Sequence, residues 1–186
     1  AFTESSYLSI GLGRSYGDVG LNEDGTLIST HNLNKIISFN EINGIINCES
    51  GLSIKEILNF IIPKGWFLPV VPGTRNVTIG GAIANDIHGK NHHVDGTFGN
   101  YIKSMRLLRS DGAILNCSNE ENTEYFDATI AGLGLTGIIL SAELQLKKIT
   151  SEYIDVETFK YKSLDEYWKI NSYCEEKYDY TVSWVD

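Results

Sequence analysis

The chain has 186 residues, enough for one well-packed core or for one domain and part of a second. Its 24 acidic and 15 basic residues leave a net charge of −9 at pH 7, which argues against a nucleic-acid-binding surface. Cys48, Cys117 and Cys174 are odd in number and widely spaced, which predicts reduced, buried thiols in a cytoplasmic protein rather than disulfides or metal ligands. No apolar run reaches the ~18 residues that a membrane helix needs.

The first half of the chain alternates short strands with turns that contain asparagine or glycine. Strands are expected over residues 7–10, 26–29, 35–39 and 44–48. Ser53 and Glu56 have the spacing of a capping box. The apolar residues that follow recur at helical spacing until Pro63 and Gly65, which predicts an amphipathic helix that ends there.

The second half predicts a hairpin, a long strand and the beginning of another domain. Residues 110–112 read Ser-Asp-Gly, a strong hairpin signal. Further strands are expected over 104–109, 113–117 and 137–147, and a short helix over 120–126. We place a domain boundary near residue 149, so that 1–149 form one domain and 150–186 begin a second. This second part contains a predicted helix over 163–177 and an extended segment over 180–185.

Two glycine-rich loops are the most informative features of the chain. The first is Gly-Leu-Gly-Arg-Ser-Tyr-Gly-Asp at 11–18, and the second, 71–93, contains a proline, four glycines and three histidines. Backbone that approaches a ligand closely needs glycine, because a Cβ atom would block the approach. Two such loops therefore predict a large phosphate-bearing ligand held by main-chain N–H groups. Taken alone, the first loop is equally compatible with a surface turn, since its spacing differs from the dinucleotide fingerprint.

Together the loops resemble the FAD-binding domain of the vanillyl-alcohol oxidase type (PCMH-type) flavoenzymes, and most closely the oxidase components of decaprenylphosphoryl-ribose 2-epimerases. The segments that carry the resemblance are GLGRSYGD (11–18), PGTR (72–75), GGAIA (80–84), DIHGKNHH (86–93), GN (99–100) and GLTGII (134–139). The resemblance implies an α+β fold of two small α/β subdomains, followed by the start of a substrate or cap domain. We expect the chain to be a fragment that lacks part of the N-terminus and most of the cap domain.

The resemblance also implies bound FAD. The cofactor-binding residues would be Gly11, Leu12, Gly13, Arg14, Ser15, Tyr16, Gly17, Gly73, Thr78, Ile79, Gly80, Gly81, Asn85, Asp86, Ile87, His88 and Ile139. Many relatives, such as alditol oxidases, have a histidine at the position of Arg14 that bonds covalently to the flavin. We therefore expect noncovalent FAD, with the Arg14 guanidinium pairing with phosphate or flavin oxygens. Mycobacterial relatives have cysteine at the position of Asn85. Thr78 can equally be a helix N-cap, and Ile139 a residue of a core strand.

The second loop also contains the candidate catalytic residues. Imidazole is a common metal ligand, but His88, His92 and His93 form no His-Glu-x-x-His pattern and have no obvious carboxylate partner, so we predict no metal site. The resemblance places His88 and Lys90 at the reactive face of the isoalloxazine. A positive charge there would stabilise an anionic reduced flavin. Without the resemblance, Lys90 would be an ordinary surface lysine.

By this resemblance the chain is part of an FAD-dependent oxidoreductase that oxidises a sugar hydroxyl to a keto-sugar. The substrate would be the 2-hydroxyl of a polyprenylphosphoryl pentose for the cell wall, and a short-chain reductase partner would complete an epimerisation. The protein would be cytoplasmic and contact a membrane only through its lipid substrate. The alternatives are an aldonolactone or alditol oxidase that uses oxygen, such as D-arabinono-1,4-lactone oxidase, and a non-catalytic flavin-binding module. Hydride transfer needs a base for the hydroxyl proton, and none is evident, so we expect the fragment alone to be inactive.

Overall fold

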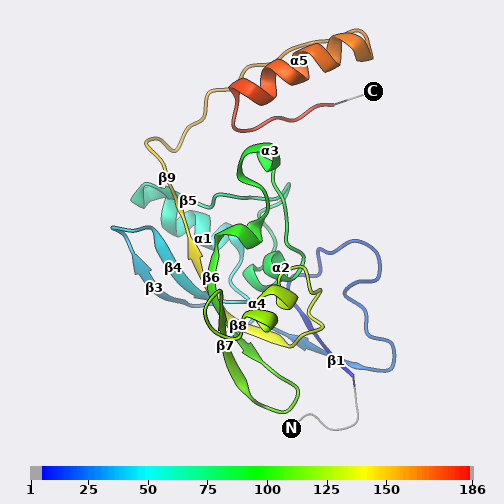
Figure 1. The fold of residues 1–186 in the computed structure, drawn as a ribbon, viewed down its shortest axis with the longest axis vertical. Coiled ribbons are helices and arrows are strands. Elements are labelled where there is room, and N and C mark those ends of the chain that lie inside the picture. Colours follow the sequence, from blue (N-terminus) through cyan, green and yellow to red (C-terminus); the bar gives the residue numbers. More distant parts are fainter. Residues whose placement is uncertain (1–5, 185–186) are drawn as a thin grey trace.

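The structure is a computed structural model that describes residues 6–184. Its largest element is a five-stranded antiparallel sheet in the order β3-β4-β8-β6-β7 (Figure 1). The strands are β3 (Ile36–Asn40), β4 (Ile45–Glu49), β8 (Ile138–Gln145), β6 (Ile102–Leu108) and β7 (Ile114–Ser118). Strand β8 is the last of these five strands in chain order. It lies at the centre of the sheet and so joins its two halves.

Alternation of side chains along the central strands gives the sheet one buried face. Ala142 and Leu144 of β8 are buried, whereas Glu143 between them lies on the other face. Ala142 pairs with Cys48 of β4 and with Met105 of β6, both also buried. The core therefore begins as a row of small and apolar side chains across three neighbouring strands.

Three helices cover this buried face: α1 (Ile54–Ile61), α2 (Ile79–Ala84) and α4 (Thr123–Thr129). The predicted capping box of α1 is confirmed, because the Glu56 N–H donates to Ser53 Oγ (3.2 Å) and the Ser53 N–H donates to Glu56 Oε2 (2.9 Å). The helix passes into a short 3-10 helix, η1 (Ile62–Lys64), which ends at Gly65 with φ of 79°. The apolar face of α1 packs into the same core as the sheet.

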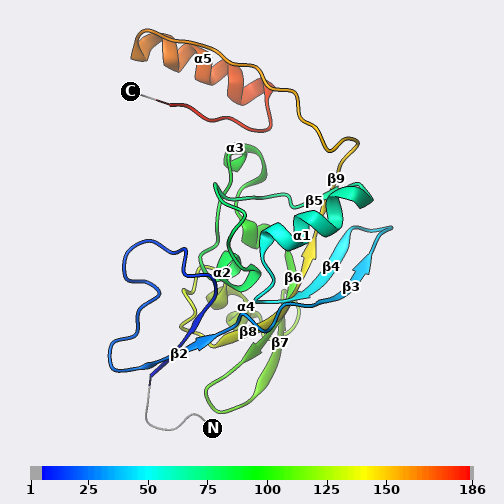
Figure 2. The ribbon, with the colours of Figure 1, turned by 180° about the vertical axis from the view of Figure 1, so that it is seen from behind.

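Two small sheets flank the central one. Strands β1 (Tyr7–Ile10) and β2 (Thr26–Ser29) pair in parallel, and the first glycine loop lies in the connection between them (Figure 2). Strands β5 (Trp66–Phe67) and β9 (Lys147–Lys148) pair antiparallel. The second glycine loop follows β5 and contains α2 and the short helix α3 (His92–Asp95), and η2 (Phe98–Tyr101) comes after it.

The predicted elements are found with small shifts, and three expectations need correction. The helix expected at 120–126 begins at Thr123, because Ser118 Oγ accepts from the N–H groups of Glu120 and Glu121 and holds them in a turn. The strand expected at 137–147 ends at Gln145, and β9 turns away to pair with β5. Residues 180–184 lie in no strand, since no neighbouring strand pairs with them, and residue 185 is outside the described range.

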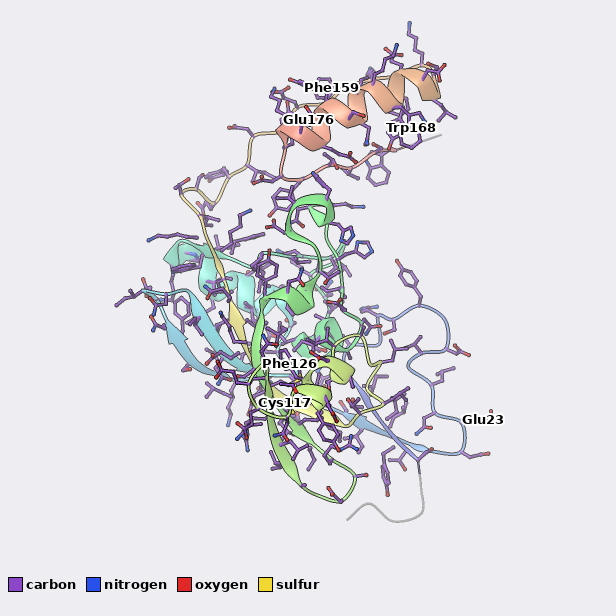
Figure 3. The ribbon with its side chains drawn as sticks, in the orientation of Figure 1. Glu23, Cys117, Phe126, Phe159, Trp168 and Glu176 are labelled. Carbon is purple, nitrogen blue, oxygen red and sulfur yellow. The ribbon has the colours of Figure 1, made fainter. Side chains whose placement is uncertain are left out.

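The last part of the described chain lies apart from the core. Helix α5 (Leu164–Lys177) has no buried residue, and Figures 1 and 2 show it displaced from the sheet. Figure 3 shows Phe159 and Trp168 in this outlying part, far from Phe126 and Cys117 of the main body. After α5 the chain returns toward α3. Over residues 6–184, no helix is both long and apolar enough to cross a membrane.

The three cysteines are free. Cys48 and Cys117 are buried in the core, and burial raises the pKa of Cys48 to about 12. The prediction of unpaired, buried thiols is confirmed for Cys48 and Cys117, whereas Cys174 of α5 is unpaired but only half-buried.

Candidate functional site

A groove of about 670 Å³ opens between the two glycine loops and the turn that leads into β8. The first loop contributes all of residues 11–17 to its lining. The second loop contributes Gly73, Thr78, Gly80, Gly81, the run 85–88 and Lys90, and β8 contributes Ile139. The volume lies within the ~300–1,000 Å³ usual for small-molecule and cofactor sites. The groove thus brings together both predicted catalytic residues and every predicted cofactor residue except Ile79.

Ile79 does not line the groove, because it belongs to the core beneath it. Its side chain is fully buried, and its N–H donates to the Leu52 carbonyl (2.9 Å). Ile79 therefore anchors α2 to the body of the domain.

The backbone of the first loop has no protein partner. Within residues 6–184, residues 11–17 make no hydrogen bond to any other part of the chain. Gly13 and Gly17 have φ values of 61° and 59°, in the left-handed region that other residues rarely adopt. Arg14, Ser15 and Tyr16 are exposed. A groove lined by such unpaired main-chain N–H groups, with a guanidinium beside them, is suited to an anionic ligand.

In the second loop, Thr78 begins α2. Its Oγ1 accepts from the Gly81 N–H (3.2 Å), so the N-cap role expected as an alternative is confirmed. The Gly80 N–H donates to the Ser50 carbonyl (2.7 Å), which fastens α2 to the end of β4. Gly80 and Gly81 are therefore already constrained by the protein itself. A Cβ on Gly80 would lie 3.0 Å from Ser50 Cβ, and one on Gly81 would lie 3.1 Å from Thr78 Oγ1.

Gly73 differs from these glycines because nothing in the protein requires it. A Cβ built on Gly73 would meet no atom within 4 Å, and its φ is not in the left-handed region. The residue lines the groove, so the space above it opens toward whatever the groove holds. A glycine that the fold does not need, at the wall of a groove, fits a close approach of ligand to backbone.

Ser50 is a groove residue that the sequence did not single out. It is 1% exposed, it lines the groove, and its Oγ has no hydrogen-bond partner among the described residues. A buried hydroxyl without a partner costs roughly 1–3 kcal/mol. A polar ligand in the groove would supply the missing partner. No sequence signal marks Ser50, which follows a strand like many other serines. Gly134 and Gly137 also line the groove, and they lie in the glycine run that was part of the sequence resemblance.

Residues 85–90 of the second loop form another part of the groove lining. Asp86 has φ of 41°, unusual for a residue with a side chain, and its Oδ1 accepts from the Gly99 N–H (2.7 Å). The Phe98 N–H donates to the Ile87 carbonyl (2.9 Å). The side chain of Asp86 therefore holds the loop in place, while His88 and Lys90 remain exposed at the groove.

The neighbouring histidines have backbone partners. His92 Nδ1 lies 3.3 Å from the Gly96 carbonyl, and His93 Nε2 lies 3.2 Å from the Tyr178 carbonyl. The ring centroids of His88 and His92 are 5.5 Å apart. Among residues 6–184, no three His, Cys, Asp or Glu side chains gather as a group that could hold a metal ion.

Comparison with known proteins decides the family. Residues 3–118, more than half of the chain, match the FAD binding domain family. The chain belongs to this FAD binding domain family. The predicted resemblance to the PCMH-type domain is thereby confirmed, as are the α+β class and FAD as the cofactor of the family.

Members of the family with sugar or lactone substrates are among the relatives. The chain is 40% identical over 178 residues to decaprenylphosphoryl-beta-D-ribose oxidase of Mycolicibacterium smegmatis, covering 95% of this chain and 39% of that protein. It is 27% identical to L-gulonolactone oxidase of Mus musculus, covering 73% of this chain and 30% of that protein. The fold matches a carbohydrate oxidase from Microdochium nivale with a TM-score of 0.69 at 22% identity, over 76% of this chain and 30% of that one. The chain thus spans about two fifths or less of these proteins.

Proposed function

We propose that the groove binds FAD without a covalent bond, and that the protein to which these residues belong oxidises a sugar hydroxyl to a ketone. The observation that carries this proposal is the convergence of two separate glycine loops with His88 and Lys90 on one groove. A site for a nucleotide alone would need the loops but not an exposed imidazole and an ammonium in its lining.

The polar groups that line the groove support FAD as its ligand. The unpaired amides of residues 11–17 and the Arg14 guanidinium suit the diphosphate, and the Ser50 hydroxyl lacks a partner that the cofactor would supply. Arg14 cannot form the histidyl bond found in covalent relatives. His88 is the one histidine in the described lining, and it belongs to the second glycine loop, whereas Arg14 belongs to the first.

The bound FAD would supply the acceptor for a hydride from the carbon that bears the hydroxyl. His88 and Lys90 would orient that hydroxyl and provide positive charge beside the acceptor. Oxidation to the ketone releases the hydroxyl proton, which needs an accepting base. Within residues 6–184, the groove offers His88 and Asp86 as titratable bases, and Asp86 already accepts from Gly99. Because Asp86 is engaged and His88 is assigned to orienting the hydroxyl, we assign the base to another part of the whole protein.

For the substrate we propose the 2-hydroxyl of a polyprenylphosphoryl pentose, oxidised as the first half of an epimerisation that a separate reductase completes. The support is the 40% identity to decaprenylphosphoryl-beta-D-ribose oxidase across nearly all of this chain. The identity to lactone oxidases is lower, 27% for the mouse protein. Contact with a membrane would then come through the lipid part of the substrate.

The test is a visible spectrum of the full-length protein, followed by acid precipitation and by anaerobic addition of substrates. We expect flavin bands that pass wholly into the acid supernatant, and bleaching of the bound flavin by a polyprenylphosphoryl ribose. Flavin that stays with the pellet would refute noncovalent binding. Bleaching by aldonolactones with rapid oxygen uptake would favour the lactone oxidase instead, and flavin that no polyol reduces would leave a binding module.

A further inference from the structure

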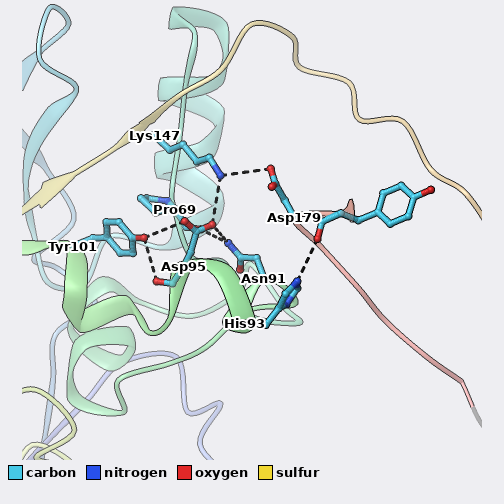
Figure 4. Close-up of polar contacts among 8 residues, drawn as sticks. Pro69, Asn91, His93, Asp95, Tyr101, Lys147 and Asp179 are labelled. Atoms are coloured by element: carbon cyan, nitrogen blue, oxygen red, sulfur yellow. Dashed lines mark hydrogen bonds and ion pairs between the residues drawn. The ribbon is translucent and has the colours of Figure 1, made fainter. Parts of the chain in front are cut away.

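Lys147 of β9 lies between two carboxylates from distant parts of the chain. Its Nζ is 3.4 Å from Asp95 Oδ2 at the end of α3 and 3.7 Å from Asp179 Oδ2 just after α5 (Figure 4). The Lys147 side chain is 36% exposed and that of Asp95 is 15% exposed, so the first pair is screened less than a surface pair. Burial alone would lower the pKa of Lys147, but Asp95 and Asp179 outweigh it and leave the pKa above its usual value.

Asp95 is the centre of this network. Its Oδ2 accepts from Asn91 Nδ2 (2.6 Å), and its Oδ1 accepts from the Tyr101 hydroxyl (3.2 Å). Asn91 is fully buried, and its Nδ2 also donates to the Pro69 carbonyl (2.7 Å). The carboxylate thus ties both ends of the second glycine loop to the strand that carries Lys147.

The segment that contains Asp179 makes two further contacts with the same loop. The Thr181 N–H donates to the Lys90 carbonyl (3.0 Å), and the Tyr178 carbonyl lies 3.2 Å from His93 Nε2. Lys90 therefore has its backbone held by residues 178–181 while its side chain lines the groove. Residues 178–184 do not themselves line the groove. Their contacts reach the site only through the loop.

We propose that Lys147 is a positioning residue: by bridging Asp95 and Asp179, it fastens residues 178–181 against the backbone of Lys90 and so fixes the place of Lys90 in the groove. The catalytic meaning of this bridge rests on the proposed function, whereas the bridge itself does not. Residues 178–181, which follow α5, thereby affect the groove through the backbone of Lys90.

The first test is hydrogen exchange on the full-length protein with Lys147→Met, Lys147→Arg and, as the matched control, Lys148→Met on the same strand. Loss of a partly exposed ion pair changes local stability enough to speed exchange roughly two- to fivefold. We expect this acceleration over residues 90–96 and 178–182 in Lys147→Met, with recovery in Lys147→Arg and no change in Lys148→Met. Equal exchange in all variants would overturn the bridge.

Asp179→Asn is a second test variant. We expect the protein to fold normally with this substitution, because the Asp179 side chain is 63% exposed. It should speed exchange over 178–182 and less over 90–96, whereas Asp95→Asn should affect both. Acceleration over 90–96 without any over 178–182 in Lys147→Met would show that the C-terminal segment is not held by Lys147, and would overturn the proposal.

The second test asks whether Lys147 acts through Lys90. The rate of anaerobic flavin reduction is measured in Lys147→Met, Lys90→Met and the double variant. If Lys147 positions Lys90, the double variant reduces no more slowly than Lys90→Met, a non-additive result. Additive slowing would refute a positioning role. If no sugar reduces the flavin at all, the proposed function fails, and the exchange result still decides the bridge.

Discussion

Gly11 packs so closely against Thr78 that any side chain on Gly11 would collide with the Thr78 hydroxyl. The two glycine loops, which are more than fifty residues apart in the sequence, therefore touch at this point. The contact fixes the width of the groove at its base, since Thr78 is itself held as the N-cap of α2.

Gly11→Ala should therefore push the two loops apart. The new methyl group meets a side chain that is 2% exposed and cannot move without loss of the cap, so we expect destabilisation by about 1–3 kcal/mol together with weaker FAD binding. Gly20→Ala is the control, because a Cβ there would meet only Ile10 Cδ1 at 3.8 Å, an ordinary contact. Thermal melts with and without FAD measure both effects. Equal melts for the two variants would contradict the tight contact.

Gly73→Val should separate cofactor binding from folding. The new Cβ has no described protein atom within 4 Å, so stability without FAD should change by less than about 0.5 kcal/mol. FAD affinity, measured by quenching of flavin fluorescence, should fall more than roughly tenfold if the cofactor passes over this residue. Gly81→Val should abolish flavin retention too, but it also disturbs Thr78. Unchanged affinity in Gly73→Val would remove Gly73 from the cofactor site.

Ser50→Ala tests the hydroxyl that lacks a partner. Without FAD, the variant should be as stable as the wild type or slightly more so, because an unsatisfied buried hydroxyl is removed. With FAD, it should lose one hydrogen bond, which lowers affinity roughly five- to tenfold. Calorimetric titration of the apoprotein measures this difference. A variant that loses stability without FAD and keeps full affinity would show that the hydroxyl serves the fold.

His88→Ala and Lys90→Met should each keep most of the flavin and slow its reduction. Both side chains are exposed at the groove and make no hydrogen bond or ion pair that holds the described fold together. We expect a loss of roughly hundredfold in the reduction rate for His88→Ala, because the substrate hydroxyl loses a group that orients it for hydride transfer. Stopped-flow absorbance of the flavin under anaerobic conditions is the measurement. An unchanged rate would exclude the residue from catalysis.

The capping box gives a pH dependence whose sign follows from Glu56. Hydrogen bonds from the Ser53 hydroxyl and the Ser53 N–H lower the pKa of Glu56 below its usual value of 4.5. A carboxylate with a lowered pKa in the folded state stabilises the fold above pH 4.5, and this contribution disappears as the pH falls through the folded-state pKa. Denaturant unfolding at pH 7 and at pH 3 should show that Glu56→Gln costs stability only at the higher pH. A cost equal at both would mean that charge plays no part.

Local features of the sequence predicted much of the structure. Ser53, Glu56 and Gly65 lie close together in the chain. The start and the end of the helix between them could therefore be predicted from their spacing alone. Residues 11–17 and part of the groove lining from the second loop were also named in advance, from a resemblance that concentrates in glycines, whereas Pro72, Val77, Ala82 and Ala84 were not. The role of Asp86 in holding Gly99 was not evident, because either residue could equally have faced the ligand.

Contacts between distant residues were beyond the reach of the sequence. Lys147 meets Asp95 and Asp179 only because β9 pairs with β5 and the chain turns back after α5. Ser50 lacks a hydrogen-bond partner only because α2 packs over the end of β4, which no pattern of spacing reveals. The start of the helix at Thr123 was missed for a smaller reason, a serine hydroxyl that holds two amides in a turn.

The parallel pairing of β1 with β2 has a consequence for how this site can change. Ile10 pairs with Ser29, and Ser6 accepts from the Thr26 N–H, so strand pairing fixes the start and the end of the connection independently of its content. With Gly11 kept because it packs against Thr78, residues 12–17 can therefore be exchanged as a cassette, since no hydrogen bond to the described body is lost. A cassette with histidine in place of Arg14 would offer the flavin a covalent attachment on the same scaffold. The mode of cofactor attachment is thus separable from the architecture that holds the cofactor.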